Sequence, residues 1–191
     1  HGQIICDADE LLPPDDDDDD DVEDAYSLEN FAYGSTPLST WLRLMEEIEA
    51  TGHSTEVSWG VLGSSCGWLV FYASVISGHA AHGWEILPSL HRCAVRVAEE
   101  EVSVLAGSAG SSRLVFDSIF DLMKFHCEDA LTANVGQCGA VAIAGQCWEK
   151  WLLHAMYKKI RTECEVGTLL LDYNGGLSEL LDKEKKEKKR E

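Results

Sequence analysis

From residue 36 onward, apolar residues recur at intervals of three and four, which is the spacing of amphipathic helices. Thr36 or Ser39 can cap the first of these segments, and Gly52 ends it. No segment of convincing length alternates between apolar and polar residues, so the pattern predicts helices and no strands. The predicted helices run over 38–48, 59–81, 86–106, 114–127, 133–160, 166–171 and 177–181.

The segment 133–160 differs from the other predicted helices. Between Cys138 and Trp148, apolar and small residues occupy every helical face. A helix that is apolar all round lies inside a bundle rather than on its surface. The pattern therefore predicts an all-α fold of six or seven helices around a buried, hydrophobic fifth helix.

The formal net charge of −19 is distributed unevenly. Residues 1–30 carry −13 and include seven consecutive aspartates at 15–21, whereas residues 183–191 carry +3. Mutual repulsion predicts a disordered acidic arm over 1–35, followed by a helical bundle over 36–182 and a charged Lys/Glu tail over 183–191. The acidic balance argues against nucleic acid as a partner, and no stretch is apolar for long enough to span a membrane.

Seven cysteines form an odd number, with no Cys-x-x-Cys pair among them. Most lie on apolar stripes of the predicted helices, where a free thiol behaves as a small hydrophobic side chain. Free thiols are typical of a reducing compartment, and the first residues do not resemble a signal peptide. We expect a cytoplasmic protein, with the nucleus as an alternative because of the basic tail.

Three short segments follow one another in the order of the homology motifs of the Bcl family of apoptosis regulators. The segment 93–101 has an apolar residue, a small residue and acids, as in the third motif. Asn134-Val135-Gly136-Gln137 is similar to the Asn-Trp-Gly-Arg of the first motif, and Tyr173–Leu177 is similar to the Asn-Gly-Gly-Trp of the second. Over about 61–182 the chain therefore resembles the Bcl family, whose amphipathic helices surround a hydrophobic fifth helix.

The motifs depart from the family pattern. Val135 and Leu177 replace tryptophans, and Gln137 replaces the arginine that pairs with an aspartate of the bound peptide. These departures resemble the divergent poxvirus-encoded branch. That resemblance implies a virus-encoded interaction protein that binds host proteins and suppresses NF-κB-type signalling. The sequence shows no catalytic signature, so we expect no enzymatic activity and no cofactor. An anti-apoptotic protein that captures death-promoting helical peptides is the alternative, and a homodimer stays open.

The same resemblance implies a partner-binding groove. Its floor would draw on the third and fourth predicted helices and on the start of the fifth. The residues expected there are Leu90, Ala94, Val97, Ile119, Phe120, Met123, Val135 and Gln137.

The acidic arm contains a second candidate binding segment. Ile4, Cys6, Asp9, Glu10 and Leu11 resemble the Leu-x-Cys-x-Glu motif by which viral oncoproteins bind retinoblastoma pocket proteins. The residue two positions after the cysteine is alanine, where the motif has glutamate. A retinoblastoma pocket protein is therefore a candidate partner, and a merely solubilising tail is the alternative.

One pair of histidines raises the alternative of a small metal-binding protein or enzyme. His79 and His82 are three positions apart, which places two imidazoles on one face of a predicted helix. No third ligand is near them in the sequence, so we expect no metal site.

Overall fold

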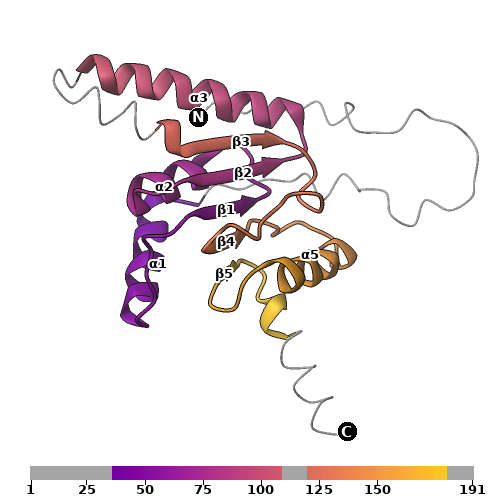
Figure 1. Ribbon diagram of the computed structural model, residues 1–191. Helices are drawn as coiled ribbons and strands as arrows, with labels where there is room; N and C mark the ends of the chain where they lie inside the picture. Colours follow the sequence, from indigo (N-terminus) through magenta and orange to yellow (C-terminus); the bar gives the residue numbers. More distant parts are fainter. Residues whose placement is uncertain (1–35, 109–119, 180–191) are drawn as a thin grey trace, which may run out of the picture.

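The computed structural model describes residues 36–108 and 120–179. They form a five-stranded, entirely parallel sheet with the strand order β3-β2-β1-β4-β5, with helices on both faces (Figure 1). The fold is therefore α/β, and the prediction of an all-α, Bcl-like bundle is wrong. The elements are α1 (Leu38–Ala50), β1 (Trp59–Leu62), α2 (Trp68–Ser77), β2 (Ala81–Glu85), α3 (Pro88–Ser108), β3 (Met123–Cys127), β4 (Ala140–Ile143), α5 (Lys150–Glu163) and β5 (Leu169–Asp172).

Four of the predicted helices contain strands. The segment 59–81 holds β1, α2 and the first residue of β2, while the predicted central helix 133–160 holds a loop, β4 and most of α5. Every residue of β1 and β4 is buried. Central parallel strands contact helices on both faces, so their sequences are continuous apolar runs with no alternation. Such short runs have the same composition as a buried helix, which is why the prediction failed here.

The two helices with one clear apolar stripe are confirmed. α1 occupies the predicted position and buries Trp41, Met45 and Ile48. The ring centroids of Trp41 and Trp59 are 5.3 Å apart, so α1 packs directly against β1. α3 likewise matches the predicted helix 86–106 closely.

The sheet separates two apolar cores. Trp41 of α1 and Val70 of α2 lie in one core, together with Trp59 and Val61 of β1. Leu62 of β1 and residues of α5 lie in the other core. Because successive side chains of a strand point to opposite faces, β1 contributes to both cores.

The connection from β3 to β4, residues 128–139, consists of turns and contains no helix.

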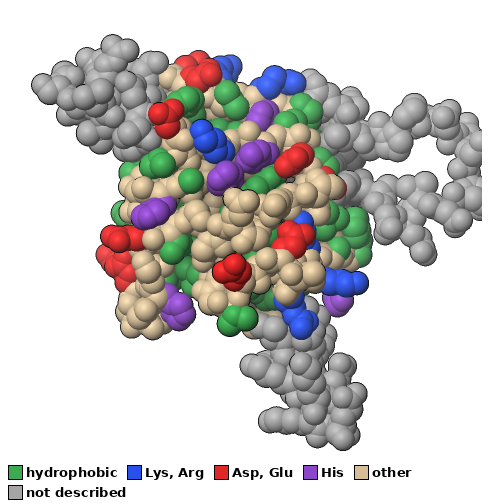
Figure 2. All heavy atoms as spheres, in the orientation of Figure 1, with side chains coloured by type: hydrophobic (Ala, Val, Ile, Leu, Met, Phe, Trp, Pro, Cys, Tyr) green, Lys and Arg blue, Asp and Glu red, His purple; other side chains and the backbone are tan. Residues whose placement is uncertain are grey.

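Two histidines lie side by side on neighbouring strands. His82 of β2 and His126 of β3 lie on the same face of the sheet as Trp84, and Figure 2 shows histidine side chains gathered over β2 and β3. His82 Nδ1 and His126 Nε2 are 3.1 Å apart, and the two rings are within 4° of parallel. The two imidazoles therefore share one hydrogen bond, while the Trp84 indole N–H donates to Glu128 Oε1 at 3.0 Å.

Several sequence predictions concern residues outside this description. The acidic arm 1–35 and the tail 183–191 lie outside the described residues.

The helices found in 36–108 and 120–179 are too short or too polar to cross a lipid bilayer. The six cysteines of the described part form no disulfide bond.

Gly67 allows α2 to begin close to its neighbours. Its φ is +84°, and a Cβ there would lie 2.7 Å from Phe125 Cε1 and 3.0 Å from Ala94 Cβ. We expect Gly67→Ala to lower the free energy of unfolding by about 2 to 4 kcal/mol, because backbone strain and overpacking add. Gly78→Ala is the matched control: φ is +67° and nothing lies within 4 Å, so only strain of about 1 kcal/mol applies. Urea denaturation measures both, and equal losses would show that close packing does not require Gly67.

The imidazole pair makes stability depend on pH. Burial, and then the charges of His126 and Lys124, lower the pKa of His82 below its ordinary 6.5. The unfolded chain then binds more protons than the folded chain, so stability falls as the pH drops through 6.5 toward the lower folded value. We expect His82→Asn to remove part of this fall in urea denaturations between pH about 8 and about 5.5. His154→Asn, at an exposed position of α5, is the control, and an unchanged pH dependence in His82→Asn would contradict the prediction.

Candidate functional site

The strand order fixes where a ligand site is expected. The chain adds β2 and β3 on one side of β1, and then returns to place β4 and β5 on the other side. In open α/β sheets, ligands bind beyond the carboxyl ends of the strands, at the position where the order reverses. Here that position lies between the carboxyl ends of β1 and β4, beside the loop that joins β1 to α2.

That loop, residues 63–67, is held tightly against the end of β2. The backbone N–H groups of Gly63 and Ser64 both donate to the carbonyl oxygen of Trp84, at 3.0 and 2.9 Å. Gly63 has φ +74° and Ser65 has φ +50°, a conformation that is uncommon for a residue with a side chain. The loop therefore follows a strained, glycine-dependent path directly into the N-terminus of α2.

Glu85 joins this loop to the start of α3. Its carboxylate accepts the N–H of Ser65 at Oε2, at 2.8 Å, and the N–H of Leu87 at Oε1, at 2.9 Å. Burial, with the residue only 7% exposed, raises the pKa of the Glu85 carboxyl, and the backbone donors of Leu87, Ser65 and Ile86 oppose that rise. A carboxylate is thus kept at the carboxyl end of β2 by backbone donors on both of its oxygens.

The indole of Trp148 lies across the position where the strand order reverses. Trp148 belongs to the loop between β4 and α5 and is half-buried. A Cβ built on Gly63 would lie 2.8 Å from its Cζ2, and one built on Gly145 would lie 2.6 Å from its Cε3. The ring therefore contacts the backbone at the carboxyl ends of both β1 and β4, and both positions must lack a side chain.

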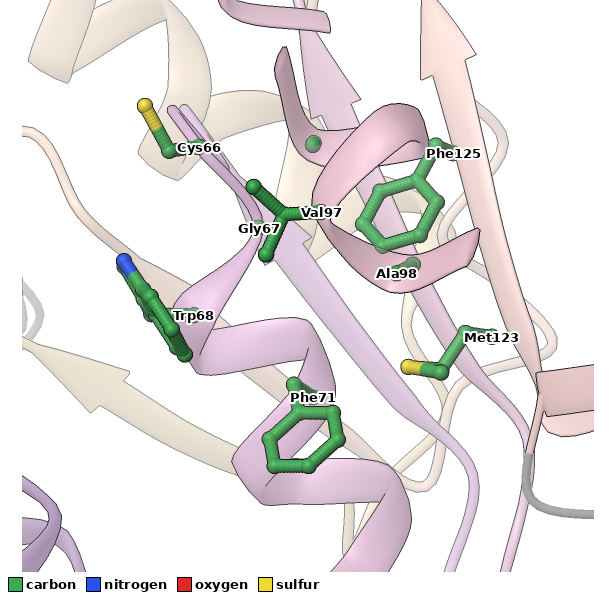
Figure 3. A pocket seen from close by; sticks show the side chains of 9 residues that line it. Cys66, Gly67, Trp68, Phe71, Val97, Ala98, Met123 and Phe125 are labelled. Carbon is green, nitrogen blue, oxygen red and sulfur yellow. The ribbon is translucent and has the colours of Figure 1, made fainter. Parts of the chain in front are cut away.

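A separate apolar pocket of about 150 Å³ lies between α2, α3 and β3 (Figure 3). Ala94 and Ala98 of α3, together with Gly67, are small enough to leave the space open, and Phe71 and Phe125 stand at its sides. None of its lining residues is charged. The pocket suits an apolar group, and it touches the β1–α2 loop at Cys66 and Gly67.

The residues of the predicted partner groove are only partly brought together. Ala94, Val97 and Met123 line this pocket. Leu90 packs with Cys66 and Leu87, and Phe120 packs against the core that contains α1 and α2. Val135 is buried in the α5 core, Gln137 is exposed, and Ile119 lies outside the described residues.

The other candidate sites from the sequence are the retinoblastoma-type motif, the histidine pair and the Bcl-like motifs. Ile4, Cys6, Asp9, Glu10 and Leu11 of the retinoblastoma-type motif lie outside the described residues. His79 follows α2 and its Nδ1 contacts the carbonyl oxygen of Ser77 at 2.7 Å, whereas His82 lies in β2, so the two do not share a helical face. Within 36–108 and 120–179, no group of three or more His, Cys, Asp or Glu side chains is placed to hold a metal ion. The segment 134–137, which resembles the first Bcl motif, is a loop with a turn before β4 and not the start of a helix.

The sequence did contain a signal for the observed site. A short apolar run ends at Leu62, a glycine-containing loop follows, and α2 begins directly after Gly67. An acid, Glu85, comes 22 positions after Gly63, close to the spacing of nucleotide-binding βαβ units. The signal is weak because Ser65 occupies a position where a glycine is usual.

Comparison with known proteins agrees with this geometry. An RNA methyltransferase from Salinibacter ruber, solved in complex with S-adenosyl-L-homocysteine, is similar with a TM-score of 0.54 and 19% identity, over 73% of this chain and 76% of that one. The glycopeptide N-methyltransferase MtfA is similar with a TM-score of 0.51 and 16% identity, over 68% of this chain, which spans about half of MtfA (51%). No protein-family model and no curated protein sequence matches the chain.

These similarities correct the remaining sequence predictions. The Bcl-like, virus-encoded interpretation is wrong because the chain shares its sheet and helices with methyltransferases rather than with helical bundles. The two functions inferred from it, suppression of NF-κB-type signalling and capture of death-promoting peptides, lose their basis with it, and so do the host signalling proteins as partners. The prediction that the chain is not an enzyme is contradicted as well, because the similar structures are methyltransferases. The chain shares the α/β fold of these two methyltransferase structures.

Proposed function

We propose that the chain is an S-adenosylmethionine-dependent methyltransferase domain. The observation that carries the proposal is the buried Glu85 carboxylate at the end of β2, hydrogen-bonded to the Ser65 N–H of the loop after β1. The S. ruber enzyme with the similar fold was solved with S-adenosyl-L-homocysteine, the product form of this cofactor.

The residues at this edge fit the nucleoside part of such a cofactor. A carboxylate at the end of the second strand accepts hydrogen bonds from ribose hydroxyls. The Glu85 carboxylate accepts backbone N–H groups on both of its oxygens and still has acceptor capacity, because an ionised carboxylate offers about four lone-pair sites. Gly63 keeps the backbone free of a side chain where the ligand would approach it most closely.

S-adenosylmethionine, when bound, supplies an electrophilic methyl group on its sulfonium. The chain's part is to bind and orient the nucleoside. Glu85 would fix the ribose, and the loop 63–67 would set its distance from the sheet through the hydrogen bonds to Trp84. The apolar pocket beside Gly67 lies on the α2–α3 side of the same loop, where an apolar group of a methyl acceptor can be accommodated.

Isothermal titration with S-adenosyl-L-homocysteine tests the proposal. We expect saturable binding to the parent chain and a loss of at least about tenfold in Glu85→Gln, because an amide cannot accept both backbone donors and the ribose hydroxyls. Glu85→Asp keeps the charge and should lose less. NAD and ATP serve as control ligands, and we expect neither to bind tightly.

Glu99→Gln, on the exposed side of α3, is the matched control, and its affinity should equal that of the parent. Circular dichroism of each variant separates lost binding from lost structure. Absence of S-adenosyl-L-homocysteine binding in the folded parent, or unchanged binding in a folded Glu85→Gln, would refute the assigned site.

A further inference from the structure

We propose that the Trp148 indole acts as a plug over the crevice between the carboxyl ends of β1 and β4, and that it must move aside to admit the cofactor. This inference rests on the proposed function and adds a residue that controls access to the same site.

The indole of Trp148 rests on the backbone of two glycines. The Cζ2 atom of Trp148 would be 2.8 Å from a Cβ on Gly63, and its Cε3 and Cδ2 atoms would be 2.6 and 2.7 Å from a Cβ on Gly145. Real Cβ atoms essentially never approach a neighbour so closely, so the ring rests directly on the backbone at both glycines. It spans the gap between the carboxyl ends of β1 and β4.

The loop that carries Trp148 is well anchored, so this position is defined. The carbonyl oxygen of Gly145 accepts the N–H of Trp148 at 3.1 Å and the side-chain amide of Asn174 at 2.6 Å. The N–H of Ala144 donates to the carbonyl oxygen of Leu62 at 3.0 Å, which ties the same loop to β1. The backbone is thus fixed, whereas the indole is half-buried and packs on the core that contains α5, so opening the crevice requires a change of the side-chain torsions of Trp148.

The place of Glu85 shows why the indole stands in the path of the ligand. If Glu85 binds the ribose beyond β2, the part of the nucleoside attached at the 5′ carbon extends along the strand ends toward β1 and β4. Adjacent strands are about 4.8 Å apart, so two strand spacings separate β2 from β4. The amino-acid portion of S-adenosyl-L-homocysteine has a similar length, and it would occupy the space over Gly63 that the indole fills.

The plug should lower the affinity of the parent chain for S-adenosyl-L-homocysteine by a measurable factor. A ligand that binds only the open state has an apparent dissociation constant equal to the intrinsic constant divided by the fraction of molecules that are open. Trp148→Ala should therefore bind S-adenosyl-L-homocysteine about three- to tenfold more tightly than the parent, and Trp148→Phe should lie between the two. A residue that only lined the site would give the opposite result, because its removal would weaken binding.

Titration calorimetry with S-adenosyl-L-homocysteine compares the parent, Trp148→Ala and Trp148→Phe. Trp151→Ala, three positions along the same segment, is the control for loss of an indole, and its affinity should match the parent. Equal or weaker binding in Trp148→Ala, with parent binding intact, overturns the plug and leaves the proposed function standing. Absence of binding in the folded parent overturns the proposed function and the plug with it.

A second measurement tests the position of the indole without any ligand. Gly145→Ala places a methyl group where the ring rests, so it should expel the indole from the crevice. The emission of Trp148, obtained as the difference between each protein and its Trp148→Phe counterpart, should then be quenched more strongly by acrylamide. Unchanged quenching in a folded Gly145→Ala variant would show that the indole does not rest there and would refute the plug.

Discussion

The candidate site depends on one buried carboxylate. Glu85 receives the N–H of Ser65 from one side and the N–H of Leu87 from the other, so a single side chain joins the β1–α2 loop, β2 and the start of α3. Without these bonds, two backbone donors next to a 7% exposed side chain would lose their partners, which costs about 1–3 kcal/mol for each unsatisfied group. The loop geometry, and with it the place of Gly63 and Gly67, follows from this arrangement.

The helices with one apolar stripe were predictable, and the sheet was not. α1 and α3 each bury one side, so the three-and-four spacing of Trp41, Met45 and Ile48 revealed a helix directly. β1 and β4 bury every residue, and their runs Trp-Gly-Val-Leu and Ala-Val-Ala-Ile carry no alternation. The small residues that suggested close helix packing in 138–148 instead serve the close approach of strand, loop and indole, as Gly145 shows.

The site was harder to foresee than the helices, because it is made of backbone. Its distinctive groups are N–H donors in a left-handed loop conformation, and only Gly63, Gly67 and the distant Glu85 mark them in the sequence. Three residues of the groove expected from the Bcl-like resemblance, Ala94, Val97 and Met123, do lie around one pocket. They meet there because α3 packs against β3, a relation that helical periodicity alone does not contain.

The two glycines beneath Trp148 are under different constraints, and this difference should be visible in the history of the family. Gly63 has a φ of +74°, so its backbone requires glycine whatever occupies position 148. Gly145 is required only because the indole lies on it, since its backbone is not in the left-handed region. Homologous chains that carry a small residue in place of Trp148 should therefore be free to vary at position 145 while they keep glycine at position 63. Positions 145 and 148 should change together, and position 63 should not change with them.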